Sequence, residues 1–89
     1  MLKQIKTDTH VVVTFDGNVI EFFQVNGGST RIHIWSITAI EIKLDRRDRH
    51  VLVVTHTPAG REHGSRIAES DLVAVQDFVA TVQQALPRD

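Results

Sequence analysis

The hydrophobic period of this chain changes once, and that change constrains the fold more than any other feature. Up to about Ile67, apolar side chains recur at every second residue in several stretches, as in strands with one buried face. From Ser70 the spacing becomes that of one helical face. The apolar residues with this spacing are Leu72, Val75, Phe78, Val79, Val82, Ala85 and Leu86. We therefore expect strands followed by one C-terminal amphipathic helix, which begins near Ser70 with that hydroxyl as its cap and ends before Pro87.

Turn residues divide the N-terminal part into strands. Residues 10–15 are β-branched and aromatic, and they stop at Asp16, Gly17 and Asn18, which favour a tight hairpin turn. The returning strand covers residues 19–25 and ends at a second Gly-rich turn, residues 26–29. Residues 2–7 have a weaker alternating pattern, so whether they form a further strand is left open.

The middle of the chain continues the alternation. In residues 30–35, Ile32 and Ile34 share one face and the polar side chains share the other, and a bend follows at Ser36. Ile40, Ile42 and Leu44 then point inward in a fourth strand. The charged residues 45–49 connect it to residues 50–56, a strand that is apolar on both faces, and a turn at residues 57–60 leads to a short polar strand over residues 61–67.

These elements predict one mainly β domain over residues 1–89, with six or seven antiparallel strands. The helix stripe must be buried, so we expect a strongly bent sheet or partly open barrel that the helix closes. Phe22 and Phe23 are adjacent, so a regular strand turns one ring away from the core. That ring needs another cover, which is the helix, a second sheet layer or another subunit; the last makes the chain a homo-oligomer.

Composition excludes several function classes. The chain has no cysteine, which removes disulfides, thiolate metal sites and cysteine nucleophiles. Its formal net charge of −1 gives no global footprint for nucleic acid or an anionic membrane. We find no secretory signal and no apolar run long enough for a membrane span, so a cytoplasmic protein is expected.

The five histidines do not predict a metal site. His50 and His56 share a strand face, with His63 on the neighbouring strand, but six strand residues span roughly 20 Å, too far for two ligands of one zinc ion. No nucleophile elbow or phosphate-binding loop is present. We therefore expect no catalytic residues, no metal and no cofactor, and a protein that is not an enzyme.

Two groups of side chains are candidates for binding. Alternation places Arg31, His33 and Trp35 on one strand face, and a solvent-facing Trp beside Arg is typical of protein interfaces. Alternatively, Trp35 closes one mouth of the barrel as part of the core. The second group, three arginines in the charged connection, is either a solvated hairpin tip or a contact site for an anion. Its members are Arg46, Arg47 and Arg49.

Residues 13–22, a strand-turn-strand segment, and residues 30–41, which contain the step Ile37-Thr38-Ala39-Ile40, resemble bacterial pleckstrin-homology-like (PH-like) domains. The resemblance continues through the hairpin at residues 45–49 and the C-terminal helix. It implies a PH-like barrel: two near-orthogonal antiparallel sheets with the helix plugging one open corner. Members of this family bind phosphoinositides, peptides or partner domains, or oligomerise, so the fold alone names no ligand.

The resemblance and the residues together predict a non-enzymatic PH-like module that acts through protein–protein contacts, self-association included. The alternative is a binding module for an anionic lipid headgroup or another small anionic ligand. Phosphoinositide-binding members carry Lys and Arg around the first hairpin loop, which we assign here to residues 16–18. Asp16 repels phosphate at that loop, so membrane association is not expected.

Overall fold

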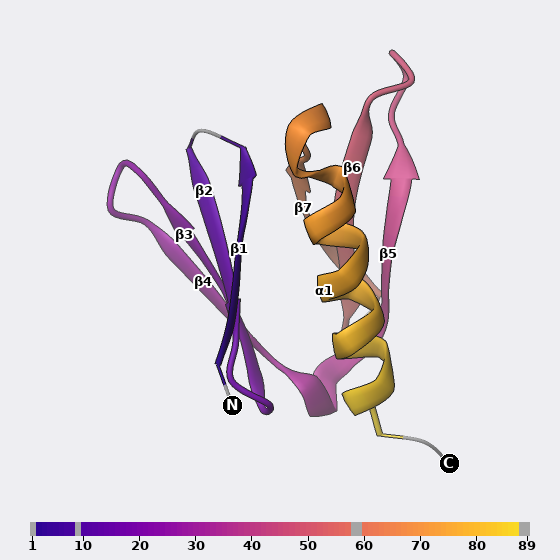
Figure 1. The fold of residues 1–89 in the computed structure, drawn as a ribbon. Coiled ribbons are helices and arrows are strands. Elements are labelled where there is room, and N and C mark those ends of the chain that lie inside the picture. The colour runs from indigo at the N-terminus through magenta and orange to yellow at the C-terminus, as the bar shows by residue number, and fades with distance from the viewer. Residues whose placement is uncertain (1, 9, 58–59, 88–89) are drawn as a thin grey trace.

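The computed structural model describes residues 2–8, 10–57 and 60–87, which form two antiparallel sheets and one long helix (Figure 1). The first sheet has the order β1 (Lys3–Asp8), β2 (Val11–Phe15), β3 (Val19–Gln24) and β4 (Ser29–His33). The second has the order β5 (Ile37–Leu44), β6 (His50–His56) and β7 (Arg61–Arg66). A 3-10 turn, η1 (Ile34–Ser36), joins the sheets, and η2 (Glu69–Asp71) leads into α1 (Leu72–Ala85). The mainly β fold with seven strands and a C-terminal helix is confirmed, and the open question about residues 2–7 is answered by β1.

The sheets do not close into a barrel. Among the described residues, no strand ladder connects one sheet to the other, and α1 lies beside the space between them (Figure 1). The predicted apolar stripe is the face of α1 that reaches the core: Val75, Phe78, Val79 and Val82 are buried, and Leu72, Ala85 and Leu86 pack against them. The rings of Phe78 and Phe15 meet edge to face, with centroids 6.5 Å apart. The helix therefore completes the core, as expected.

Polar contacts fix α1 to one strand edge of each sheet. Lys3 Nζ on β1 lies 2.6 Å from Asp77 Oδ2, and Gln83 Nε2 donates to the backbone oxygen of Ile40 on β5 at 2.9 Å. The predicted cap is wrong, because Asp71 occupies the N-cap position and makes no side-chain hydrogen bond there. The turn η2 begins at Glu69, so Ser70 falls inside it rather than at the start of the helix.

A buried pair of hydroxyls joins the two sheets near the other end of β1. Thr7 Oγ1 and Ser65 Oγ are 2.8 Å apart, and Thr7 is fully buried. Next to them the N–H of Ala68 donates to the Thr7 oxygen at 2.7 Å. Both bonds satisfy polar groups that burial would otherwise leave unpaired.

Where the strands are regular, successive residues face opposite sides of the sheet, as the alternation in the sequence predicts. Phe22 is 1% exposed and faces the core, while its neighbour Phe23 is 41% exposed on the outer face of the first sheet. Ile37 and Ile40 are both buried although they are three residues apart, because a register shift between Ile37 and Ala39 places them on the same face.

Other predictions fail at strand ends. Leu44 is 59% exposed rather than inward, because it ends β5 beside the charged loop, beyond the last residue that packs on the core.

The turn at Asp16 is the second hairpin, since β1 and β2 form the first. The absence of basic residues at Asp16 therefore does not bear on the first hairpin loop. Pro58 and Ala59 of the predicted turn lie outside the described residues.

No helix in the described part of the chain has both the length and the apolar character that a membrane crossing requires.

Candidate functional site

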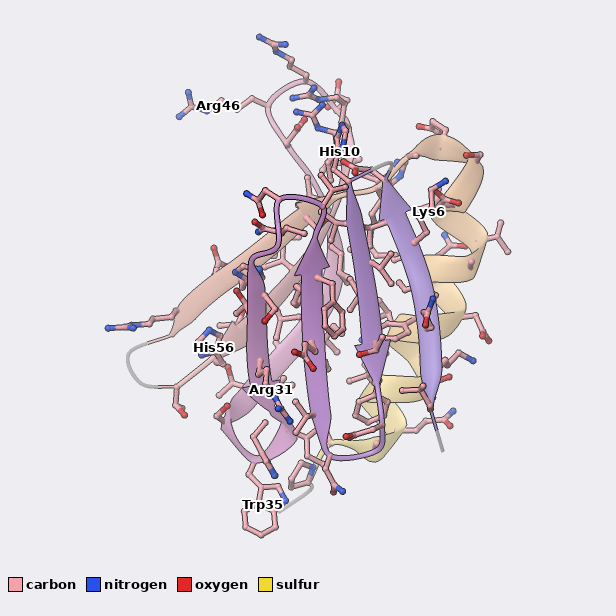
Figure 2. The ribbon with its side chains drawn as sticks, turned by 90° about the vertical axis from the view of Figure 1, so that its left-hand side faces the viewer. Lys6, His10, Arg31, Trp35, Arg46 and His56 are labelled. Carbon is pink, nitrogen blue, oxygen red and sulfur yellow. The ribbon has the colours of Figure 1, made fainter. Side chains whose placement is uncertain are left out.

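Trp35 is the most exposed large apolar side chain of the described residues. It lies in η1, where the chain passes from β4 to β5, and 80% of it is exposed. Figure 2 shows its ring projecting from the end of the molecule, with Arg31 near the same end of the first sheet. The alternative in which Trp35 belongs to the core is therefore excluded. Trp35 does not lie in the strand of Arg31 and His33, because η1 ends that strand at His33.

Hydrogen bonds hold the turn that carries Trp35. The backbone N–H of Trp35 donates to His33 Nδ1 at 3.3 Å, and the Ser36 hydroxyl donates to the backbone oxygen of His33 at 2.8 Å. The turn is tied to neighbouring loops as well, since Ile34 N–H donates to Asn18 O at 2.8 Å and Thr57 N–H to Ser36 O at 2.7 Å. The His33 ring stands edge to face against the indole, with centroids 5.2 Å apart. The indole is thus presented to solvent from a fixed backbone.

Arg31 supplies a positive charge on the outer face of β4, the strand that leads into the turn of Trp35. Its Nε lies 3.9 Å from Glu21 Oε1 on β3, at the limit of an ion pair, and its side chain remains 66% exposed. The adjacent hairpin is fixed by Asp16 Oδ1, which accepts the N–H groups of Asn18 and Val19, each at 2.8 Å. These bonds, the one from Asn18 first, lower the pKa of Asp16, so the turn keeps its acceptor charge over the physiological range. We call Arg31, His33 and Trp35 the Trp35 surface.

The backbone of β4 adds a second feature to this surface. Bonds from Gln24 N–H to Gly28 O and from Ile34 N–H to Asn18 O show that even-numbered residues of β4 pair with β3. The N–H and C=O groups of Ser29 and Arg31, and the N–H of His33, therefore point away from β3. β4 is the end strand of its sheet, and among the described elements only β3 makes extensive contact with it.

The second candidate group surrounds a hollow of about 470 Å³ at the β5–β6 loop. Its lining residues are Asp45, Arg46, Arg47, Arg49 and Arg66, which we call the arginine hollow. Asp45 organises the loop: Oδ1 accepts the N–H groups of Arg47 at 2.8 Å and Arg49 at 3.0 Å, and Oδ2 accepts Arg49 Nε at 3.0 Å. The N–H of Arg49 is the main cause that lowers the pKa of Asp45.

Sequence reasoning missed Arg66, which comes from β7. The register pairs Arg66 with Val51, so its side chain lies beside the start of β6 and the loop before it. Only the register of the β6–β7 hairpin would have revealed it. Among the described residues, Arg46, Arg47 and Arg66 form no ion pair, whereas Arg49 is held by Asp45. Figure 2 shows Arg46 and Trp35 at opposite ends of the molecule, so the two candidate surfaces are separate.

Three of the histidines lie on the second sheet. His50 begins β6 with its Nδ1 3.7 Å from Glu69 Oε1, and His56 ends the same strand. His63 faces inward and meets Phe22 edge to face, with centroids 4.5 Å apart; burial, and then the charge of His56, lowers its pKa. Within the described ranges, no group of three or more His, Cys, Asp or Glu side chains is placed to hold a metal ion.

An apolar depression on the outer face of the first sheet also escaped the sequence analysis. It measures about 200 Å³, and Val12, Phe23 and Val25 line it together with polar residues such as Lys6 and His10. Val12 and Phe23 are cross-strand partners, so the depression follows from their pairing on the face opposite the core. The adjacent phenylalanines indicated that one ring would need a cover, but not where it would lie.

Comparison with protein-family models, with curated proteins and with solved structures finds no match for this chain.

Proposed function

We propose that this chain is a non-enzymatic interaction module that binds a partner protein through the Trp35 surface. The observation that carries the proposal is the 80% exposure of Trp35 on a turn that four hydrogen bonds immobilise. Trp and Arg are enriched among the residues that contribute most to protein interfaces. An indole on a fixed backbone also loses little conformational freedom when it binds, so more of its contact energy appears as affinity.

The arrangement of the sheets supports a PH-like assignment as part of this proposal. The chain has a four-stranded and a three-stranded antiparallel sheet, joined by a short turn and plugged by a C-terminal helix. This agrees with the two sheets and the plugging helix that the sequence resemblance implies, although the sheets do not close into a barrel. Such a scaffold leaves strands and loops free for contacts while the helix belongs to the core. Function on this scaffold is then argued from the exposed surface alone.

Fragment display tests the proposal. Phage that display fragments of the source genome are selected on the wild-type chain, and the Kd of each enriched fragment is measured for wild type, Trp35→Ala and Val73→Ala. Val73 is a matched control, since it is 77% exposed but lies on α1. We expect Trp35→Ala to weaken binding by about thirtyfold or more, the effect of a strong interface anchor, and Val73→Ala to leave it unchanged. Fragments that bind both variants equally well, or no enriched fragment, would refute the proposal.

The arginine hollow supports a second candidate function, the binding of a small anionic ligand. Four of its five lining residues are positive in a chain whose formal net charge is −1. Asp45 is engaged by Arg49 and two backbone N–H groups, so its charge is already compensated within the loop. Guanidinium groups from a loop and a strand can meet phosphate oxygens through charge-assisted bonds.

Titration with inorganic tripolyphosphate, followed by amide shifts at constant ionic strength, tests this second function. Arg66→Gln removes a guanidinium of the hollow, and Arg61→Gln removes the same charge at the other end of β7 as a control. We expect saturable shifts at residues 45–49 and 66, which Arg66→Gln weakens about tenfold and Arg61→Gln does not. Equal effects of the two variants would show that the anion responds to the overall charge of the chain rather than to the arginine hollow, and would refute this second function. Vesicles that contain phosphatidic acid then show whether the same site accepts a lipid headgroup.

A further inference from the structure

β4 is the end strand of the first sheet, and its outer edge carries backbone groups that do not pair with β3. Two hydrogen bonds fix the parity of the β3–β4 ladder, and this parity directs the N–H and C=O groups of Ser29 and Arg31 outward. His33 contributes only its N–H, because its oxygen accepts the Ser36 hydroxyl. Backbone groups in a row along an end strand are the template for strand addition.

Of the other three sheet edges, those of β5 and β1 are covered, and β7 contacts β1 near Ser65. The edge of β5 is covered by α1, whose Gln83 side chain takes the Ile40 oxygen. The edge of β1 lies against α1 and β7, where Lys3 pairs with Asp77 and Thr7 meets Ser65. The edge of β4 lacks such a cover among the described elements, and it leads directly into the turn that carries Trp35.

We propose that the β4 edge binds an extended segment of a partner protein by strand addition, with an acidic residue of that segment opposite Arg31 and an apolar contact on Trp35. This inference rests on the proposed function and specifies its partner. An opposite charge directly across an antiparallel pair is stabilising, and Arg31 is held only loosely by Glu21, at 3.9 Å.

A second copy of the chain fits this edge less well. When two β4 strands pair antiparallel over their whole length, the outward residues Ser29, Arg31 and His33 face His33, Arg31 and Ser29 of the other copy. Arg31 then lies directly opposite an identical charge, which destabilises the pair. The same arginine therefore disfavours edge-to-edge self-association and favours an acidic partner.

Selection from a displayed library of short linear peptides, followed by hydrogen exchange of the wild-type complex, tests the inference. In the free chain, the amides of Ser29, Arg31 and His33 should exchange rapidly while those of Thr30 and Ile32 are protected by β3. Enriched peptides should carry an acidic residue and protect the three outward amides. Arg31→Glu should reverse the preference to basic peptides.

A proline at the first residue of β4 provides the matched variant. Ser29→Pro removes an outward N–H without breaking the β3 ladder, and Ser29→Ala is its control. We expect Ser29→Pro to weaken peptide binding about fivefold or more, the loss of one backbone hydrogen bond, and Ser29→Ala to leave it unchanged.

The outcomes separate the two proposals. Peptides that lose affinity with Trp35→Ala, yet ignore Ser29→Pro and leave the outward amides unprotected, overturn strand addition while the Trp35 surface stands. Peptides that ignore Trp35→Ala overturn the proposed function. The absence of any enriched peptide overturns strand addition. If the outward amides are protected without peptide, and sedimentation shows a concentration-dependent dimer, then the occupant is a second copy and the acidic partner is refuted.

Discussion

The buried hydroxyl pair between the two sheets allows a quantitative prediction. Thr7→Val keeps the shape of the side chain but leaves the Ser65 hydroxyl with only a 3.4 Å contact to the Arg66 oxygen. Ser65→Ala likewise leaves the Thr7 hydroxyl with the Val11 oxygen at 3.4 Å. An unpaired buried hydroxyl costs about 1–3 kcal/mol, so each single variant should lose about 2 kcal/mol of unfolding free energy.

The double variant Thr7→Val/Ser65→Ala removes both polar groups and should lose much less than the sum of the single losses. We expect a coupling free energy of about 1–2 kcal/mol. Urea unfolding followed by far-UV circular dichroism measures it, because an exposed Trp35 makes fluorescence a weak probe of unfolding. Each single variant should shift the urea midpoint by about 1 M. Strictly additive losses would show that the two hydroxyls do not depend on each other, and would refute the account of this contact.

Three further predictions concern exposure, pH and the helix contact. Acrylamide should quench the fluorescence of native Trp35 as efficiently as that of the urea-unfolded chain; a shielded native indole would contradict its placement. Burial lowers the pKa of His63, so below about pH 6.5 this residue binds more protons in the unfolded chain than in the folded one, and the free energy of unfolding should decrease as the pH is lowered. His63→Leu should flatten this dependence in urea titrations at several pH values, and an unchanged slope would contradict it. Gln83→Ala should lower the unfolding free energy by about 1 kcal/mol through loss of the hydrogen bond to the Ile40 oxygen, whereas Gln84→Ala should not. Equal effects of the two variants in urea unfolding would show that this hydrogen bond does not stabilise the fold.

The sequence was most informative where the hydrophobic period was regular. The apolar stripe of α1 and the inward positions Ile32 of β4 and Ile40 of β5 follow from spacing, because burial of one face leaves no other register. β1 was uncertain because its inward positions include Thr7, whose burial depends on Ser65 from a distant strand. The Ser70 cap was wrong because η2 inserts a turn between β7 and the helix.

Parity also explains what could be predicted of the candidate surfaces. Arg31 and His33 follow the alternation, but Trp35 lies in a 3-10 turn, where period 2 no longer applies, so its exposure could not be decided. Arg66 and the free edge of β4 depend on which strands pair and in which register. A single sequence does not contain that information in local form, whereas the three arginines of the loop were visible as neighbours in the chain.

Amide chemical-shift mapping of a selected partner fragment on the wild-type chain tests the central claim most directly. The account predicts shifts that concentrate on β4 and η1, with the largest changes at Arg31, His33 and the Trp35 indole N–H. Shifts that concentrate instead on the arginine hollow at the opposite end of the molecule, with the Trp35 indole unperturbed, would contradict it.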